Sequence, residues 1–306
     1  MTAAPNVRNG NLAPDGPNLF SSDTHQATVV VRANWSLWSH HRPVGGTWED
    51  FDLSTIAGNP LALPIVSGDS HYVAATAIDG KGRVHVLANM HNDELRYVVC
   101  TNPAAFTNPA SWADASSWIT FPGGAEEFSY STFIPLPDGR LLLAITQNDN
   151  LTVLGRDVLL FQLGPTDDAW TPGPGTTDGH LAVVNETDND GDPERAYFVG
   201  ACVSPEGRVG WFGSWAENHD DNWRRWPYYI ELDSEAGDQW RTVDGTSVTL
   251  PLTYNGTNAT STYSACEIDT FDEITVSSYP AFDENGRPNI VLQESVTNQR
   301  HRCVAK

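Results

Sequence analysis

The sequence feature that most constrains the fold is a short turn that occurs four times, each time directly before an apolar segment. In every copy acidic residues precede a glycine and an arginine, as in DGKGRV, LPDGRLL, SPEGRVG and DENGRPN. A glycine at this place supplies the positive φ that tight hairpin turns require. The pattern therefore predicts repeated β-hairpins around Gly82, Gly139, Gly207 and Gly286.

The remaining segments agree with an all-β chain. They are short apolar runs bounded by Gly, Pro, Asn and Asp, and no long stretch shows helical periodicity. The four glycines are farther apart than the roughly 40–50 residues of one propeller blade, so some blades must lack the turn. We expect a single β-propeller of antiparallel strands, with about seven blades of about 44 residues each, six blades being possible.

The two ends of the chain define the expected domain. Residues 1–18 are rich in Asn, Pro and Gly, which predicts an N-terminal arm or linker outside a propeller domain of residues 19–306. The sequence predicts no neighbouring strand for the early strand around 27–33 or for the C-terminal NQRHRCVAK. Pairing them would close the ring and remove two exposed edges.

Charge and hydropathy exclude two classes of partner. The formal net charge is −22, and only two of the seventeen basic residues are lysines. Nucleic-acid binding rests on cationic contacts to phosphates, so nucleic acid is not expected as a partner. No apolar run is long enough to span a membrane, and the start of the sequence lacks a signal peptide. We expect an extracellular or virion-associated protein.

Cysteines and acidic residues give no metal site. The four cysteines are far apart and include no CxxC pair, so we expect buried free thiols, with one or two disulfides left open. The acidic loop 185–194 has the Asp spacing of a calcium loop but lacks its distal glutamate. No metal and no other cofactor is expected.

Acid–base residues concentrate in residues 68–98 and 126–145. His71 and His91 each lie at an irregular turn, and a hairpin of the length between them returns the chain to its starting level. Both imidazoles could then face one cavity. The pKa of histidine lies near neutrality, which suits proton transfer. His85, inside the second strand, points opposite to its valine neighbours.

These segments resemble the BNR-type-repeat propellers, which include ulvan lyases, related polysaccharide lyases and phage minor tail proteins. The shared elements are a histidine before a strand, DG-x-G-x-x-H-V, NMHND-x-L-R-Y, and Tyr-x-x-Phe ahead of LPDGRLLL. The resemblance covers most of the chain, and it is specific over residues 68–143.

The resemblance implies β-elimination at a uronic acid and a glycan as partner. His71 and His91 match the acid–base histidines of these lyases, and Tyr130 matches their tyrosine. Asn92 and Arg96 become candidate contacts to the sugar. We expect His71, His91 and Tyr130 to converge at one end of the axial channel.

The sequence departs from the lyases at two cationic positions. Where the family places an arginine after the LPDGRLLL strand, this chain has Thr146–Gln147, and in a second strand it has Ala216–Glu217. Stabilisation of developing negative charge is commonly the largest catalytic contribution. The departures point to a neutral substrate, to a relocated cation such as Arg156 or Arg224, or to a fold that only binds.

A second candidate surface is the aromatic segment 217–229, ENHDDNWRRWPYY. Aromatic faces stack on sugar rings, and arginine binds hydroxyls or acids. The alternative is a loop whose aromatic residues cover the rim of the propeller. The candidate sugar contacts in and before this segment are Trp215, Trp223, Arg224 and Trp226.

Three functions follow from this pattern. The first is a virion tail protein that binds host-surface glycan and has other tail proteins as candidate partners, with trimming of the glycan left open. The second is a secreted polysaccharide lyase of the ulvan type. The third is a propeller that serves only as a structural interaction platform, which a fold alone never excludes. We expect elimination activity to be weak or absent while glycan binding is retained.

Overall fold

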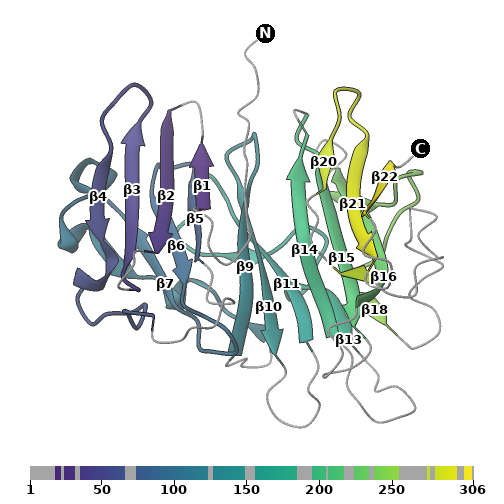
Figure 1. Cartoon of the computed structure of the whole chain (residues 1–306), viewed down its shortest axis with the longest axis horizontal. Helices are drawn as coiled ribbons and strands as arrows, with labels where there is room; N and C mark the ends of the chain where they lie inside the picture. The colour runs from purple at the N-terminus through teal and green to yellow at the C-terminus, as the bar shows by residue number, and fades with distance from the viewer. Residues whose placement is uncertain are drawn as a thin grey trace. The chain divides into compact units, whose positions relative to one another are not determined.

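A computed structural model provides the structure of the chain (Figure 1). It describes residues 18–21, 24–31, 35–65, 74–122, 127–148, 156–184, 195–204, 206–216, 224–233, 238–254, 274–275, 280–294 and 300–304. These residues form β-strands and four short 3-10 helices, with no α-helix among them, so the all-β prediction is confirmed. None of the described helices is long and apolar enough to cross a membrane. The 3-10 helices are η1 (Leu53–Thr55), η2 (Pro103–Ala105), η3 (Pro109–Ser111) and η4 (Ser116–Trp118).

The chain divides into two compact units. Unit 1 comprises residues 1–144 and 161–171, and unit 2 comprises residues 145–160 and 172–306. Unit 1 begins with a four-stranded antiparallel meander in which each strand pairs with its neighbours in the chain. Along its third strand buried and half-buried residues alternate, as expected for a strand with one covered face. The strands are β1 (Asn18–Ser21), β2 (His25–Val31), β3 (Leu37–Pro43) and β4 (Glu49–Asp52).

A second meander of the same kind forms the centre of unit 1. Its middle strands have the sequences VHVLA and YVVC, and all nine residues are buried, so both faces of these strands are covered. Nearly continuous apolar runs are typical of such strands. The meander consists of β5 (Ala74–Ile78), β6 (Val84–Ala88), β7 (Tyr97–Cys100) and β8 (Trp112–Asp114).

The third meander begins in unit 1 with β9 (Glu127–Pro135), which pairs with β10 (Leu141–Asn148). The first strands of the meanders in this unit contact one another, β1 with β5 and β5 with β9. Contact between first strands, without pairing between the meanders, is the arrangement expected of successive propeller blades.

Unit 2 contains further antiparallel pairings and two short parallel contacts. The parallel contacts join β11 to β14 at one residue pair, Arg156 with Arg195, and β13 to β18. A longer antiparallel meander runs from β14 through β17. Besides the end of β10, the strands that lie wholly or partly in this unit are β11 (Arg156–Leu163), β12 (Thr171–Pro172), β13 (His180–Val184), β14 (Arg195–Val203), β15 (Val209–Ala216), β16 (Arg224–Asp233), β17 (Gln239–Arg241), β18 (Leu252–Tyr254), β19 (Ile274–Thr275), β20 (Ala281–Phe282), β21 (Pro288–Glu294) and β22 (Arg300–Val304).

The four recurrent turns have the same structure. In the β5–β6 turn the amide of Asp79 donates to the carbonyl of Arg83 at 3.1 Å, and the amide of Gly82 donates back to the carbonyl of Asp79 at 2.9 Å. The equivalent pair of bonds closes the β9–β10, β14–β15 and β20–β21 turns. Their glycines have φ values between 70° and 91°. The predicted hairpin turns and their requirement for glycine are therefore confirmed.

The prediction that the C-terminal strand closes a ring by pairing with residues around 27–33 is wrong. Ala27 in β2 pairs with Phe20 of β1 on one side and with His41 of β3 on the other, so β2 has no open edge. β22 pairs with β21 instead. The short strand β1, which begins at Asn18, is the neighbour that the sequence pattern did not reveal. The described residues form no closed sheet, and the number of blades stays a prediction.

Several other predictions fall partly outside the described residues. They are the expected arm and the acidic loop 185–194, since the described residues begin at Asn18 and do not include that loop. No cluster of metal-binding side chains occurs within the described part of the chain. Cys100 and Cys202 are free thiols, and burial raises the pKa of Cys100 to about 11.

Candidate functional site

The loop between β6 and β7 contains the NMHND sequence and is fixed at its start by Asn89. This residue is buried and has a left-handed backbone, with φ of 61°. Its side-chain amide donates hydrogen bonds to the carbonyls of Leu61 at 2.8 Å and Ala62 at 3.0 Å. Asparagine is among the few residue types that adopt this backbone readily. Asn89 therefore sets both the direction of the loop and its contact with the segment after η1.

Arg96 closes the same loop at its other end. Its guanidinium donates to the carbonyl of Asn89 and, at 3.3 Å, to the carboxylate of Asp93. Its backbone amide lies 3.0 Å from the sulfur of Met90. The described contacts of Arg96 are thus within the loop. They favour a role for Arg96 in stabilising the loop and argue against the sugar contact that we predicted.

The loop is also fastened to the first half of β9. Asp93 and Phe128 form an isolated antiparallel bridge, in which the amide of Phe128 donates to the carbonyl of Asp93 at 2.7 Å. The amide of Asn92 donates to the hydroxyl of Ser129 at 2.9 Å, and this hydroxyl donates to the side-chain oxygen of Asn92 at 3.2 Å. The β6–β7 loop and β9 therefore form one local structure.

Tyr130 follows directly in β9 and has an unusual backbone. Its φ is 50°, and a left-handed conformation is an outlier for an aromatic residue in a strand. Ser129 and Ser131 on either side are buried, whereas Tyr130 is half-buried. The ring centroids of Tyr130 and His91 are 5.8 Å apart and the two planes are inclined by 59°. The structure thus brings these two predicted catalytic residues together.

Backbone strain is concentrated at this place. Asn89, Asn92 and Tyr130 are all left-handed, with φ of 61°, 55° and 50°. Each such residue costs free energy and persists only where the surrounding structure imposes it, and such residues cluster at active sites and ligand-binding sites. Asn92 is exposed and His91 half-buried, so a ligand can reach both side chains.

The third predicted catalytic residue, His71, lies outside the described residues, as does Trp223. The convergence of all three catalytic residues at one end of a channel therefore stays a prediction. Arg224 and Trp226 are in strand β16, where their backbone is described and their side chains are not.

Two of the candidate residues in unit 2, Arg156 and Trp215, are buried. Arg156 is 6% exposed, its guanidinium lies over the ring of Tyr197 at 5.6 Å, and it donates to the hydroxyl of Tyr197 at 3.4 Å. Trp215 is 2% exposed and its ring packs against Tyr228 at 5.6 Å. This burial favours a core position for Trp215 over a stacking surface for sugar. Tyr229, in the predicted aromatic surface, is buried as well.

Thr146 and Gln147, where the resemblance leads us to expect an arginine, are in β10. Thr146 is fully buried there, and its hydroxyl has no hydrogen-bond partner among the described residues. Gln147 is half-buried. Neither side chain carries a positive charge, so this strand provides no cation for a developing carboxylate charge.

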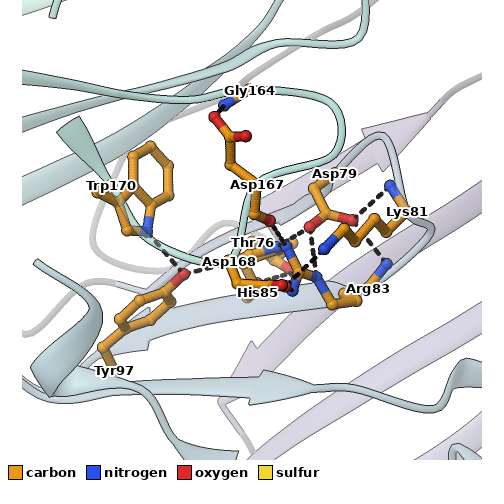
Figure 2. Close-up of polar contacts among 10 residues, drawn as sticks. All are labelled: Thr76, Asp79, Lys81, Arg83, His85, Tyr97, Gly164, Asp167, Asp168 and Trp170. Carbon is orange, nitrogen blue, oxygen red and sulfur yellow. Dashed lines mark hydrogen bonds and ion pairs between the residues drawn. The ribbon is translucent and has the colours of Figure 1, made fainter.

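A second histidine, His85, belongs to a buried polar network in unit 1 (Figure 2). The side chain is 0% exposed. Its Nδ1 lies 2.5 Å from the hydroxyl of Tyr97, which accepts a hydrogen bond from the indole of Trp170 at 3.1 Å. The other ring nitrogen, Nε2, lies 3.0 Å from the carboxylate of Asp79.

Arg83 connects this network to the segment 164–170. Its Nε donates to Asp79 at 2.6 Å, and its terminal nitrogens donate to the carboxylate of Asp168 at 2.5 Å and to the carbonyl of Asp167 at 2.6 Å. Lys81 adds an ion pair to Asp168 at 2.6 Å. Figure 2 shows how these residues fasten the β5–β6 hairpin to the turn around Asp167.

Burial sets the protonation of this network. Desolvation lowers the pKa of His85 despite the opposing effect of the Asp79 carboxylate. Burial alone would raise the pKa of Asp79, but the contacts of His85 and Arg83 outweigh it and lower this pKa. Desolvation also raises the pKa of Tyr97 far above its ordinary value. A neutral imidazole, an ionised carboxylate and a protonated phenol therefore coexist out of reach of any substrate.

Comparison with known proteins gives the family of this chain. The family model described as BNR repeat-containing family member matches residues 28–305. The structure of polysaccharide lyase Uly1 is similar, with a TM-score of 0.64 and 15% identity, covering 98% of this chain and 71% of that one.

A PL25 ulvan lyase gives a TM-score of 0.61 and 14% identity over 95% of this chain and 66% of the lyase, and so does its complex with -[GlcA(1-4)Rha3S]-. This chain thus spans slightly less than two thirds of the length of that lyase. A search of curated proteins gave no match. The likeness to these structures is a likeness of fold, and because the family model covers nearly the whole sequence, the chain belongs to the BNR repeat-containing family.

Proposed function

We propose that this chain binds a polysaccharide at a site formed by His91, Asn92 and Tyr130. The observation that carries the proposal is the 5.8 Å approach of the His91 and Tyr130 rings, with Tyr130 held in a left-handed backbone. The structures named above are those of polysaccharide lyases, one of them with a bound uronic-acid disaccharide unit. This supports a glycan as the ligand class.

The chemistry of the site suits binding better than turnover. An imidazole, a phenol and a side-chain amide provide donors and acceptors for sugar hydroxyls, and the aromatic ring provides a surface for stacking. Elimination also requires a donor or cation that stabilises negative charge in the transition state. Arg96 is bonded within its own loop, and Thr146 occupies the family position of an arginine. We therefore expect binding with weak or no elimination.

Elimination at a uronic acid is the second candidate function, and the His91–Tyr130 pair favours it. In this reaction the pair would take the proton next to the carboxylate and return a proton to the departing glycosidic oxygen, leaving an unsaturated sugar end. The overall charge of −22 disfavours the approach of a polyanionic substrate.

A virion tail is the setting that we propose for glycan binding, because the sequence resembles phage minor tail proteins with this repeat. Mass spectrometry of purified virus particles tests this setting. Detection of the chain among the tail proteins would support it, and its presence only in the secreted fraction of cells would favour the lyase.

The binding site is tested with a panel of neutral, uronate and sulfated polysaccharides. Calorimetry measures affinity, and ultraviolet absorbance of unsaturated ends measures elimination. We expect His91→Ala and Tyr130→Phe each to weaken binding by tenfold or more. The matched control is His40→Ala, because His40 is a half-buried histidine paired with Asp50 at 2.6 Å in the first meander. Unchanged affinity in both site variants would overturn the proposed site.

Robust elimination that is abolished by His91→Ala would establish the second candidate function instead. Binding without product release would support the first. Both outcomes include binding, and only elimination raises the ultraviolet absorbance. The absorbance measurement therefore distinguishes them.

A further inference from the structure

Trp35, between β2 and β3, is placed at a cost in free energy. It is 48% exposed, and its backbone is left-handed, with φ of 59°. Exposure leaves a large apolar surface in water, and the left-handed conformation is a true outlier for a bulky residue. A residue that is both exposed and strained suggests a function that the fold itself does not require.

The backbone of Trp35 is tied to the site loop through one short segment. The carbonyl of Trp35 accepts a hydrogen bond from the amide of Ile65 at 3.0 Å. Three residues earlier, Ala62 accepts from the side chain of Asn89 at the start of the NMHND loop. Three peptide steps span at most about 11 Å, so Trp35 and the loop are near neighbours in unit 1.

The connecting segment is itself stiffened. The side chain of Asn59 accepts from the amide of Leu63 at 3.0 Å and donates to its carbonyl at 2.7 Å. Asn59 and Ala62 are both left-handed, with φ of 47° and 49°. The segment therefore holds Trp35 at a fixed position relative to Asn89.

A second exposed tryptophan shows what distinguishes Trp35. Trp48 is 41% exposed, but the guanidinium of Arg42 lies over its ring at 4.6 Å and is held there by Gln26. Among the described residues, no aromatic ring or guanidinium covers the ring of Trp35. Because Trp35 is 48% exposed, its ring can receive a flat, weakly polar partner, which a pyranose ring provides.

We infer that Trp35 is a sugar-stacking subsite that extends the His91–Tyr130 site, so that the affinity increases with the length of the glycan. This inference rests on the proposed function, because the occupant is a further residue of the same glycan. An uncharged indole contributes equally to neutral and acidic sugars. The contribution of this subsite to affinity therefore depends on the length of the glycan and not on the charge of the glycan.

The test uses oligosaccharides of increasing length, prepared from a polysaccharide that the wild-type protein binds. Trp35→Asn removes the ring, and asparagine tolerates the left-handed backbone, so the variant is expected to fold. Calorimetry should show a loss of tenfold or more in affinity for the longest oligosaccharide and none for the shortest. Trp35→Phe should keep most of the affinity, and Trp48→Ala should keep all of it.

The outcomes separate this inference from the function on which it rests. If the wild-type protein binds no glycan, both are overturned. If it binds but Trp35→Asn has the same affinity at every length, the subsite alone is wrong. Equal losses of affinity at all oligosaccharide lengths would also overturn the subsite. They would mean either that Trp35 belongs to the primary site or that the variant is generally destabilised. Thermal unfolding would detect the second case.

Discussion

Two regions of unit 1 contain the same three residue types in opposite states. The buried network combines His85, Tyr97 and Asp79, and the candidate site contains His91 and Tyr130, with Asp93 on the same loop as His91. The first has a fully buried histidine whose Nδ1 lies 2.5 Å from the Tyr97 hydroxyl and whose Nε2 lies 3.0 Å from the Asp79 carboxylate. The second is half-buried and is built on left-handed residues. Residue type therefore does not identify a site, whereas exposure and backbone strain do.

The difference has a physical basis. In a low-dielectric interior, a polar group is stable only when every donor and acceptor has a partner, so a buried network is closed to ligands. A binding site needs polar groups that a ligand can reach, and in this loop the backbone maintains their positions. In this protein the hydrogen bonds of Asn89, Arg96 and Ser129 hold the backbone of the NMHND loop in place.

The largest expected contrast is between the two aspartates. Asp79→Ala removes a buried carboxylate from Arg83 and His85, and breaking such a pair lowers the free energy of unfolding by about 3–5 kcal/mol. Asp93→Ala acts on a partly exposed pair, for which about 1 kcal/mol or less is expected. Urea denaturation measures both. Equal losses would show that the two regions do not differ in the way described.

The two tyrosines give a smaller contrast of the same kind. Tyr97→Phe leaves the ring nitrogen of His85 and the indole of Trp170 without their partner, which costs about 1–3 kcal/mol. Tyr130→Phe should change the stability by about 0.5 kcal/mol and lower glycan affinity instead. Denaturation and calorimetry on both variants check this, and a glycan defect in Tyr97→Phe would count against the separation of the two regions.

The pH dependence of stability should come from the buried histidines. The pKa of His85 is lowered in the folded protein by burial, and that of His41 is lowered by burial and then by His25, both from 6.5. The unfolded state therefore binds protons first. Stability is complete above about pH 6.5 and decreases as the pH falls below it, by about 1.4 kcal/mol per pH unit for each group until its folded pKa is reached.

The check on this prediction is the variant His85→Gln. Its free energy of unfolding should be lower at neutral pH but should depend less steeply on pH between about 6.5 and 5. His40→Gln serves as the matched control. A pH profile of His85→Gln that is parallel to the wild type would assign the dependence to other groups.

The smallest effect is expected at Asn92, which is exposed and left-handed. Asn92→Gly keeps a backbone that adopts this conformation easily and removes the side chain, so the stability should change by less than about 0.5 kcal/mol. Glycan affinity should nevertheless fall severalfold. An unchanged affinity would limit the site to His91 and Tyr130.

The sequence predicted the parts of the molecule that depend on local rules. The four turns could be predicted because each needs a residue with positive φ, which glycine adopts most easily. The shared sequence motif predicted that His91 and Tyr130 lie in one site. Asparagine at 89 and 92 was a further signal, since this residue is enriched in left-handed positions.

The remaining features depend on contacts that a single sequence does not encode. β1 has the sequence NLFS, too short to be recognised as a strand, so the sequence pattern predicts an open edge on β2. Alternation placed His85 opposite to the valines, but both faces of β6 are buried, so direction did not predict exposure. Nothing in the type of Trp35 or Trp215 shows that one is exposed and the other is core.

The pairing of β1 with β2 has a consequence for how the chain acquires its structure. Each strand of the first meander pairs only with neighbours in the chain, so all of its ladders are complete once residue 52 has been synthesised. Local pairing gives low contact order and rapid formation, whereas closure by a distant strand requires the whole chain first. The N-terminal meander can therefore assemble during translation, and the edges of its inner strands β2 and β3 are paired before the later strands leave the ribosome.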